Sequence, residues 1–179
     1  MTSSTPEGPD LAGLLRELAT YRDARRAFLA TLGCDGSNRD PLSEFSEQIA
    51  LAALGGTMAE SRVQKGWDLK DPEGRRVQVR YLTNPVTTQW PNEHDVDFRG
   101  GGCDRYALVL FEGLEPLAML VFDAEHMAAV GAALAKRHGD QEHLLKLTRA
   151  NYLTMKGDPE RFAALGVTVV DLVPPAPSP

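Results

Sequence analysis

The clearest alternation of apolar and polar residues lies in the stretch 67–82, near the middle of the chain. Every second residue from 77 to 81 is apolar, and the positions between them hold Gln78 and Arg80. A period of two places these two sets on opposite faces of a β-strand. Residues 70–74 contain a proline and a glycine, which predict a turn, and the resulting hairpin brings Asp68 beside Gln78 and Arg80. A carboxylate, an amide and a guanidinium on one face of a sheet are an unusual choice for solvation alone, so we expect the function here.

A long amphipathic helix is predicted near the N-terminus, over residues 11–32. Apolar residues recur there at three- and four-residue steps, Asp10 stands at the capping position and Gly33 follows the last turn. We expect the apolar face to pack on the main body. In the alternative interpretation, the helix is an arm whose arginines, on the opposite face, bind phosphate.

A second helix is predicted over residues 40–54, because Asp40 is a capping residue, a proline follows it and two glycines end the segment. Glu44 and Glu47 lie side by side on one face of this helix. Acids in the first turns of a helix complement its macrodipole, so these two carboxylates serve either that purpose or a site beside the hairpin.

The remainder of the chain predicts a mixture of strands and helices. Residues 83–104 form the least regular stretch, for which we predict a long loop. After it we expect strands at 105–111, 117–122 and 167–173, and helices at 123–137, 141–155 and 158–166. This order predicts an α/β fold with a mixed central sheet flanked by helices, plus the extra N-terminal helix.

One domain accounts for most of the chain. We expect disordered tails at residues 1–10 and at the proline-rich residues 174–179, and a single domain over 11–173. Within it, residues 11–39 form the N-terminal helix and loop, and residues 40–173 form the core.

Composition narrows the class of protein. The 179 residues are 42% hydrophobic and 25% charged, as in globular proteins, and the longest apolar runs are too short to span a bilayer. The N-terminus differs from a signal peptide, and the two cysteines, Cys34 and Cys103, fit a reducing environment, so we expect a cytoplasmic protein without membrane association. The net charge of −6 argues against broad non-specific nucleic-acid binding and leaves room for a local basic groove.

The polar residues around the hairpin predict a metal site. Asp68, Gln78 and either Glu44 or Glu47 supply oxygen ligands from three elements, which suit Mg²⁺ or Mn²⁺. Such an ion polarises a phosphodiester and activates a water molecule, and Arg80 can stabilise the negative charge that develops in the transition state.

These residues also occur in a pattern that resembles a known family, the PD-(D/E)XK nuclease superfamily, which has the restriction-endonuclease-like fold. The pattern consists of SEFSE at residues 43–47, KGWDL at 65–69 and RVQVR at 76–80. The resemblance extends from residue 40 to about residue 111 and rests on short motifs. It implies a restriction-endonuclease-like core and a magnesium-dependent endonuclease, a hydrolase for which we expect DNA rather than RNA as the nucleic acid. It also implies pairing into a homodimer or with a protein partner, for which we expect the N-terminal helix to be used.

The resemblance assigns roles to individual residues. Asp68 is the main metal ligand, Gln78 a neutral ligand, Arg80 the occupant of the motif's lysine position, and Glu44 or Glu47 the helix acid. Two positions depart from the family pattern: Gln78 replaces an acid, and Arg80 replaces a lysine that can lose its proton. Two hypotheses therefore remain: a nuclease of weakened activity, or an inactive nuclease-fold module that binds nucleic acid or protein.

Residues near the hairpin are candidates for substrate contacts, namely Trp90, His94 and Arg76. Trp90 is either a stacking platform for a base or an anchor that holds the loop on the core. A remote alternative is an unrelated metal hydrolase built on His94, Asp95 and Asp97. The three glycines at 100–102 do not follow a strand in the manner of a phosphate-binding loop.

Overall fold

The computed structural model describes residues 10–60, 66–134 and 143–172 of the chain. The chain divides into two compact units, residues 1–44 and residues 45–179. Both tails predicted to be disordered lie almost entirely outside the described residues.

The first unit consists of helix α1 (Leu11–Thr31), a loop and the first turn of helix α2 (Pro41–Leu54). Both helices were predicted from the sequence and are confirmed. The amide of Leu42 donates to the carboxylate of Asp40 at 2.8 Å, which caps α2 as expected. The predicted packing of the apolar face of α1 on the main body stays a prediction. Several large apolar side chains of this helix are exposed, namely Leu11, Leu14, Leu15, Leu18 and Tyr21.

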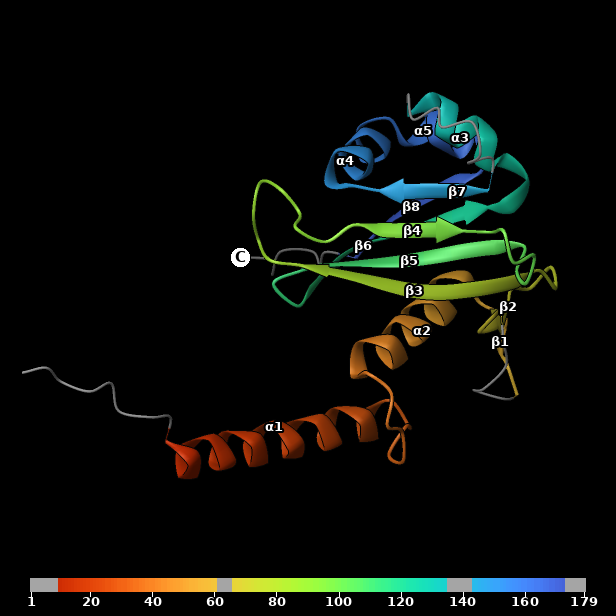
Figure 1. The fold of residues 1–179 in the computed structure, drawn as a ribbon. Coiled ribbons are helices and arrows are strands. Elements are labelled where there is room, and N and C mark those ends of the chain that lie inside the picture. The colour runs from red at the N-terminus through yellow and green to blue at the C-terminus, as the bar shows by residue number, and fades with distance from the viewer. Residues whose placement is uncertain (1–9, 61–65, 135–142, 173–179) are drawn as a thin grey trace, which may run out of the picture. The chain divides into compact units, whose positions relative to one another are not determined.

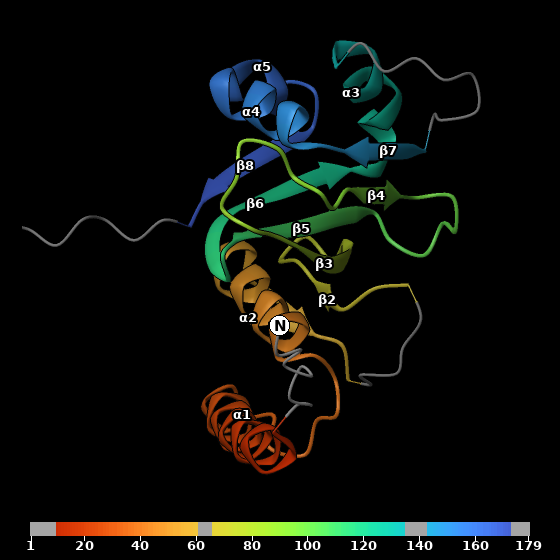
Figure 2. The same ribbon diagram turned by 60° about the vertical axis from the view of Figure 1, so that its left-hand side comes forward.

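The second unit is built on a mixed, mostly antiparallel sheet of six strands in the order β1-β2-β3-β5-β6-β8 (Figures 1 and 2). Its strands are β1 (Thr57–Met58), β2 (Leu69–Lys70), β3 (Arg76–Asn84), β5 (Arg105–Glu112), β6 (Glu115–Asp123) and β8 (Val167–Asp171). Neighbouring strands are antiparallel except β3 and β5, which run parallel. The predicted mixed sheet with flanking helices is therefore confirmed.

A second, two-stranded sheet pairs β4 (His94–Asp97) with β7 (Leu144–Leu147) in antiparallel register. The sequence prediction was wrong at both segments, because it placed β4 inside a long loop and began a helix at residue 141. Val96 of β4 and both Leu145 and Leu147 of β7 are buried, so each strand gains its conformation from a partner about fifty residues away. Helix α4 (Arg149–Gly157) begins only after β7.

Different layers cover the two faces of the main sheet. On one face, Phe111 of β5 packs against Phe45 of α2, with ring centroids 6.4 Å apart. The other face carries Leu82 and Leu108 into the main core, beneath the β4–β7 sheet and three helices (Figure 1). These helices are α3 (Met127–Ala133), α4 and α5 (Pro159–Ala163). Within the described residues, no helix has both the length and the apolar character needed to cross a membrane.

Gly56, directly before β1, shows how closely the chain is packed around the hairpin. Its φ is +94°, and an added Cβ would collide with the carbonyl oxygen of Lys70 in β2. We expect Gly56→Ala to lower the free energy of unfolding by about 3 kcal/mol, since it combines an unfavourable backbone conformation with a backbone clash. Gly74→Ala is the matched control: its φ is +83° but its Cβ meets open space, so the cost should be about 1 kcal/mol. Equal losses in urea denaturation would show that the clash is relieved elsewhere.

Candidate functional site

The β2–β3 hairpin fixes the backbone of Asp68. The amide of Asp68 donates to the carbonyl of Val77 at 2.8 Å, and its carbonyl accepts from the amide of Ala59 at 2.9 Å. The predicted turn follows β2, where Gly74 has a φ of +83° and donates to the carbonyl of Asp71 at 2.9 Å. Asp68 lies directly before β2 rather than within it, and it is held beside β3 as the alternation predicted.

The carboxylate of Asp68 extends the pairing between the two strands. Its Oδ2 accepts the backbone amide of Val79 at 2.7 Å and lies 3.4 Å from Nη1 of Arg80. Within the described part of the chain, Oδ1 of Asp68 has no hydrogen-bond partner. The side chain is 18% exposed, and the hydrogen bonds of Oδ2 give that oxygen a structural role.

The guanidinium of Arg80 lies at the surface beside this carboxylate. Nη1 also donates to the carbonyl of Val79 at 2.7 Å, and the side chain is 43% exposed. Burial and, after it, the positive charge of Arg80 lower the pKa of His94 in β4. Arg80 and Asp68 thus form a partly exposed ion pair, and the positive charge of Arg80 acts on His94 in β4 of the second sheet.

Gln78 precedes Arg80 by two residues on the same face of β3. Its Oε1 accepts a long contact of 3.9 Å from the thiol of Cys103, and no other hydrogen bond of its side chain occurs among the described residues. Gln78 pairs in register with Tyr106 of β5. The structure therefore brings Asp68, Gln78 and Arg80 together at one end of the hairpin.

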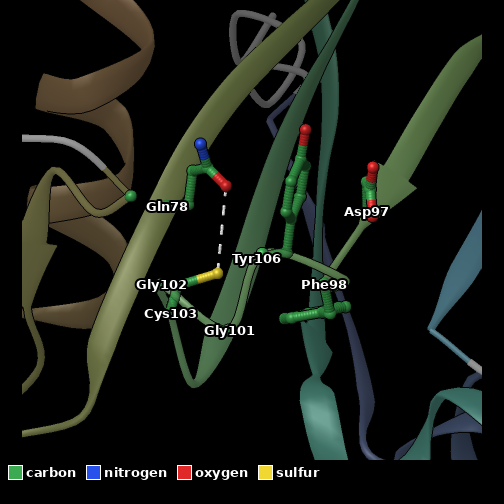
Figure 3. Close-up of a pocket in the computed structure, with 9 residues that line it drawn as sticks. Gln78, Asp97, Phe98, Gly101, Gly102, Cys103 and Tyr106 are labelled. Carbon is green, nitrogen blue, oxygen red and sulfur yellow. Dashed lines mark hydrogen bonds between the residues drawn. The ribbon is translucent and has the colours of Figure 1, made fainter.

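A pocket of about 310 Å³ adjoins Gln78 (Figure 3). Its lining residues are Gly66, Gln78, Asp97, Phe98, Gly100, Gly101, Gly102, Cys103 and Tyr106. At its rim the backbones of Gly66 and Gly102 approach so closely that a Cβ on Gly102 would lie 2.9 Å from the Cα of Gly66. Burial raises the pKa of Cys103 to about 11, so this thiol stays protonated at neutral pH.

Tyr106 connects the pocket to β4. Its hydroxyl shares a hydrogen bond of 2.7 Å with Nε2 of His94, and burial raises the pKa of Tyr106. The sequence analysis did not identify Tyr106, Phe98 or Cys103 as site residues. The available signal was a hydroxyl-bearing side chain in the otherwise apolar strand at residues 106–111.

Glu44 belongs to the first unit, where its carboxylate organises the loop after α1. It accepts from the hydroxyl of Ser37 at 2.6 Å and from the thiol of Cys34 at 3.6 Å, and it lies 3.7 Å from Nη1 of Arg39. The side chain is 1% exposed. These contacts give Glu44 a structural role, and its predicted part in a metal site stays a prediction. Glu47, in the second unit, is also buried, and its predicted role likewise stays a prediction.

The predicted substrate contacts lie in different environments. Arg76 pairs with Asp104, with Nη2 of Arg76 2.9 Å from Oδ1 of Asp104. Trp90 is buried: its indole donates to Glu112 at 2.7 Å and its ring stacks on Tyr152 with centroids 5.8 Å apart, as expected for a loop anchor. His94 lies one hydrogen bond from the pocket, through Tyr106.

The remote alternative, a metal site on His94, Asp95 and Asp97, gains no support. Both carboxylate oxygens of Asp97 accept from the guanidinium of Arg99, at 2.9 and 2.7 Å. Among residues 10–60, 66–134 and 143–172 there is no group of three or more His, Cys, Asp or Glu side chains arranged to hold a metal.

A magnesium ion held by few protein ligands remains compatible with the hairpin. Mg²⁺ usually keeps several waters and binds through one or two carboxylates together with substrate phosphates. Oδ1 of Asp68 and Oε1 of Gln78 are oxygen ligands of the right kind, with one formal charge between them. The residues present fit a weakly held ion that depends on substrate phosphate to complete its coordination. Lys65 of the sequence motif lies outside the described residues.

No protein-family model and no curated protein sequence matches this chain.

Proposed function

We propose that this chain is a nuclease-like protein that binds the phosphodiester backbone of nucleic acid at Asp68, Gln78 and Arg80 and hydrolyses it with a divalent metal, at a weakened rate. The observation that carries the proposal is the meeting of a carboxylate, an amide and a partly exposed guanidinium at the end of one hairpin. The resemblance of the hairpin motifs to PD-(D/E)XK nucleases points to the same chemistry.

Each residue has a separate task in this proposal. Oδ1 of Asp68 and Oε1 of Gln78 would hold Mg²⁺ or Mn²⁺, which supplies a Lewis acid for the phosphodiester and a bound water of lowered pKa. The guanidinium of Arg80 is a cation that stabilises negative charge on the phosphate, and it does not act as a base. The neutral Gln78 holds the ion less strongly than an acid would, which is the reason for the weakened rate.

A second candidate function is a binding module of the same fold without catalysis. The observation that favours it is that Oδ2 of Asp68 is already engaged by the amide of Val79 and by Arg80, while the carboxylate of Glu44 is engaged within its own loop. In this case Arg80 binds phosphate by charge alone, and affinity falls steeply with salt concentration.

Metal dependence of the intact protein separates the two functions. We expect cutting of plasmid, single-stranded DNA or RNA in Mg²⁺ or Mn²⁺ that stops in EDTA, together with Mn²⁺ binding in calorimetry. Oligonucleotide binding without cutting and without Mn²⁺ binding would reject hydrolysis and leave the binding module. Cutting that continues in EDTA would reject the metal mechanism.

A further inference from the structure

The pocket beside Gln78 has features that the phosphodiester site does not use. One of its lining residues, Gln78, lies two residues before Arg80 on the same face of β3, and Arg80 forms the ion pair with Asp68. The volume of the pocket, about 310 Å³, is at the small end of the range for ligand-binding pockets. A pocket of this size admits a single ring system and excludes a base pair. The pocket belongs wholly to the second unit.

The charges of the pocket favour a neutral ligand. Asp97 is the acid in its lining. The hydrogen bonds from Arg99 lower the pKa of Asp97, so this carboxylate is ionised, and the guanidinium of Arg99 compensates its charge. The thiol of Cys103 stays protonated. A ligand entering here meets no uncompensated charge from these groups.

The remaining lining is suited to a flat ring with hydrogen-bonding edges. The rings of Phe98 and Tyr106, in edge-to-face contact with centroids 5.8 Å apart, supply an apolar wall. The glycines at 100–102 present backbone without side chains, which permits the close approach of a planar group. The side-chain NH₂ of Gln78 has no hydrogen-bond partner within the described ranges, and its carbonyl accepts only the long thiol contact.

From these features we infer that the pocket binds one unpaired nucleobase. The side-chain NH₂ of Gln78 is a donor that the metal site does not use, and it can donate to a ring nitrogen or a carbonyl on the edge of a base while Oε1 faces the metal. Proteins that bind an unpaired or flipped base use this combination of edge hydrogen bonds and an apolar wall. A nucleotide whose base enters the pocket brings its phosphate toward Arg80. The inference rests on the proposed function in taking nucleic acid as the substrate, and it assigns single-stranded or locally unpaired nucleic acid as the substrate class.

Titration of the intact protein with nucleosides tests the inference separately from hydrolysis, since a nucleoside has no phosphate and needs no metal. We expect saturable shifts of the backbone amides of residues 100–102 and of the side-chain amide of Gln78 in ¹H–¹⁵N spectra. The dissociation constant should be about 0.1–1 mM and equal in Mg²⁺ and in EDTA. A single-stranded oligonucleotide should bind at least about tenfold more tightly than its duplex.

Two variants locate the binding. Gly100 lines the pocket and an added Cβ there meets open space, so Gly100→Leu should fold, place a large apolar side chain at the pocket and weaken nucleoside binding at least about tenfold. Gly36→Leu, at an exposed glycine that is equally open, should leave binding unchanged. Gln78→Leu removes the amide donor and should also weaken nucleoside binding.

Several outcomes would overturn the inference: no saturable shift at about 10 mM nucleoside, binding that survives Gly100→Leu, or duplex and single strand bound equally. Nucleoside binding without any cleavage would reject the hydrolytic function alone. Cleavage without nucleoside binding would reject the base pocket alone.

Discussion

Replacing Arg105 with methionine is expected to lower the free energy of unfolding by about 2–4 kcal/mol. The guanidinium of Arg105 bridges two acids: Nη1 lies 3.3 Å from Oδ2 of Asp71, and Nε lies 2.8 Å from Oδ1 of Asp123. The side chain of Asp71 is 1% exposed and that of Arg105 is 13% exposed. Removing the cation leaves a buried carboxylate whose one remaining charge partner among the described residues is Arg75, and methionine preserves the apolar stem.

Lowering the pH should reduce the loss of unfolding free energy caused by Arg105→Met. Burial acts to raise the pKa of Asp71, but the hydrogen bonds of Arg75, and then that of Arg105, bring it below its ordinary value of 3.8. A lowered folded-state pKa stabilises the fold above the unfolded-state pKa, and that stabilisation is lost as the pH falls through the folded-state value. The cost of Arg105→Met should therefore be largest at neutral pH and shrink below about pH 3.8.

Urea denaturation at pH 7 and at about pH 3 measures both effects. Lys146→Met is the matched control, because its ion pair with Glu93, at 3.4 Å, is 56% and 45% exposed and should contribute no more than about 0.5 kcal/mol. A cost for Arg105→Met as small as that of the control, or one independent of pH, would show that the bridge is not a stabilising element.

Local patterns were sufficient to predict the hairpin. The period-two alternation from residue 77 placed Gln78 and Arg80 on one face, and the Pro-Gly turn placed Asp68 beside them. Strands were also found where the sequence predicted them, at Arg105–Glu112, Glu115–Asp123 and Val167–Asp171, because each is a short apolar segment bounded by turn residues. The predicted end of the last strand, residue 173, lies outside the described residues. These features depend on neighbours within a few residues, which a sequence displays directly.

The β4–β7 sheet and the pocket depend on contacts between distant segments. Residues 144–147 contain three leucines that fit a helix as well as a strand, and only pairing with β4 decides between them. The pocket joins residues 66, 78 and 97–106, and the Gly66–Gly102 approach is visible only in three dimensions. The same limit applies to Glu44. Its position on α2 could be predicted from the sequence, but its hydrogen bonds with Ser37 and Cys34 could not.

Asp68→Asn is expected to lower metal-dependent cleavage by at least about a hundredfold while changing the free energy of unfolding by less than about 1 kcal/mol. The asparagine carbonyl can still accept the amide of Val79, so the end of the hairpin keeps its backbone pairing. The negative charge that would hold the metal is lost. Initial rates of oligonucleotide cutting in Mn²⁺, with Asp35→Asn as an exposed control of equal charge change, measure the effect.

The same variant has the opposite consequence if the chain is a binding module. Asp68 then only competes with nucleic acid for Arg80, whose Nη1 lies 3.4 Å from the carboxylate. Removing the competing charge leaves Arg80 available to a phosphate, so oligonucleotide binding should tighten and its salt dependence should steepen. Because a metal ligand and a masking counter-ion respond in opposite directions, Asp68→Asn separates the two functions in one protein. Cleavage retained at the rate of Asp35→Asn would remove Asp68 from the catalytic site.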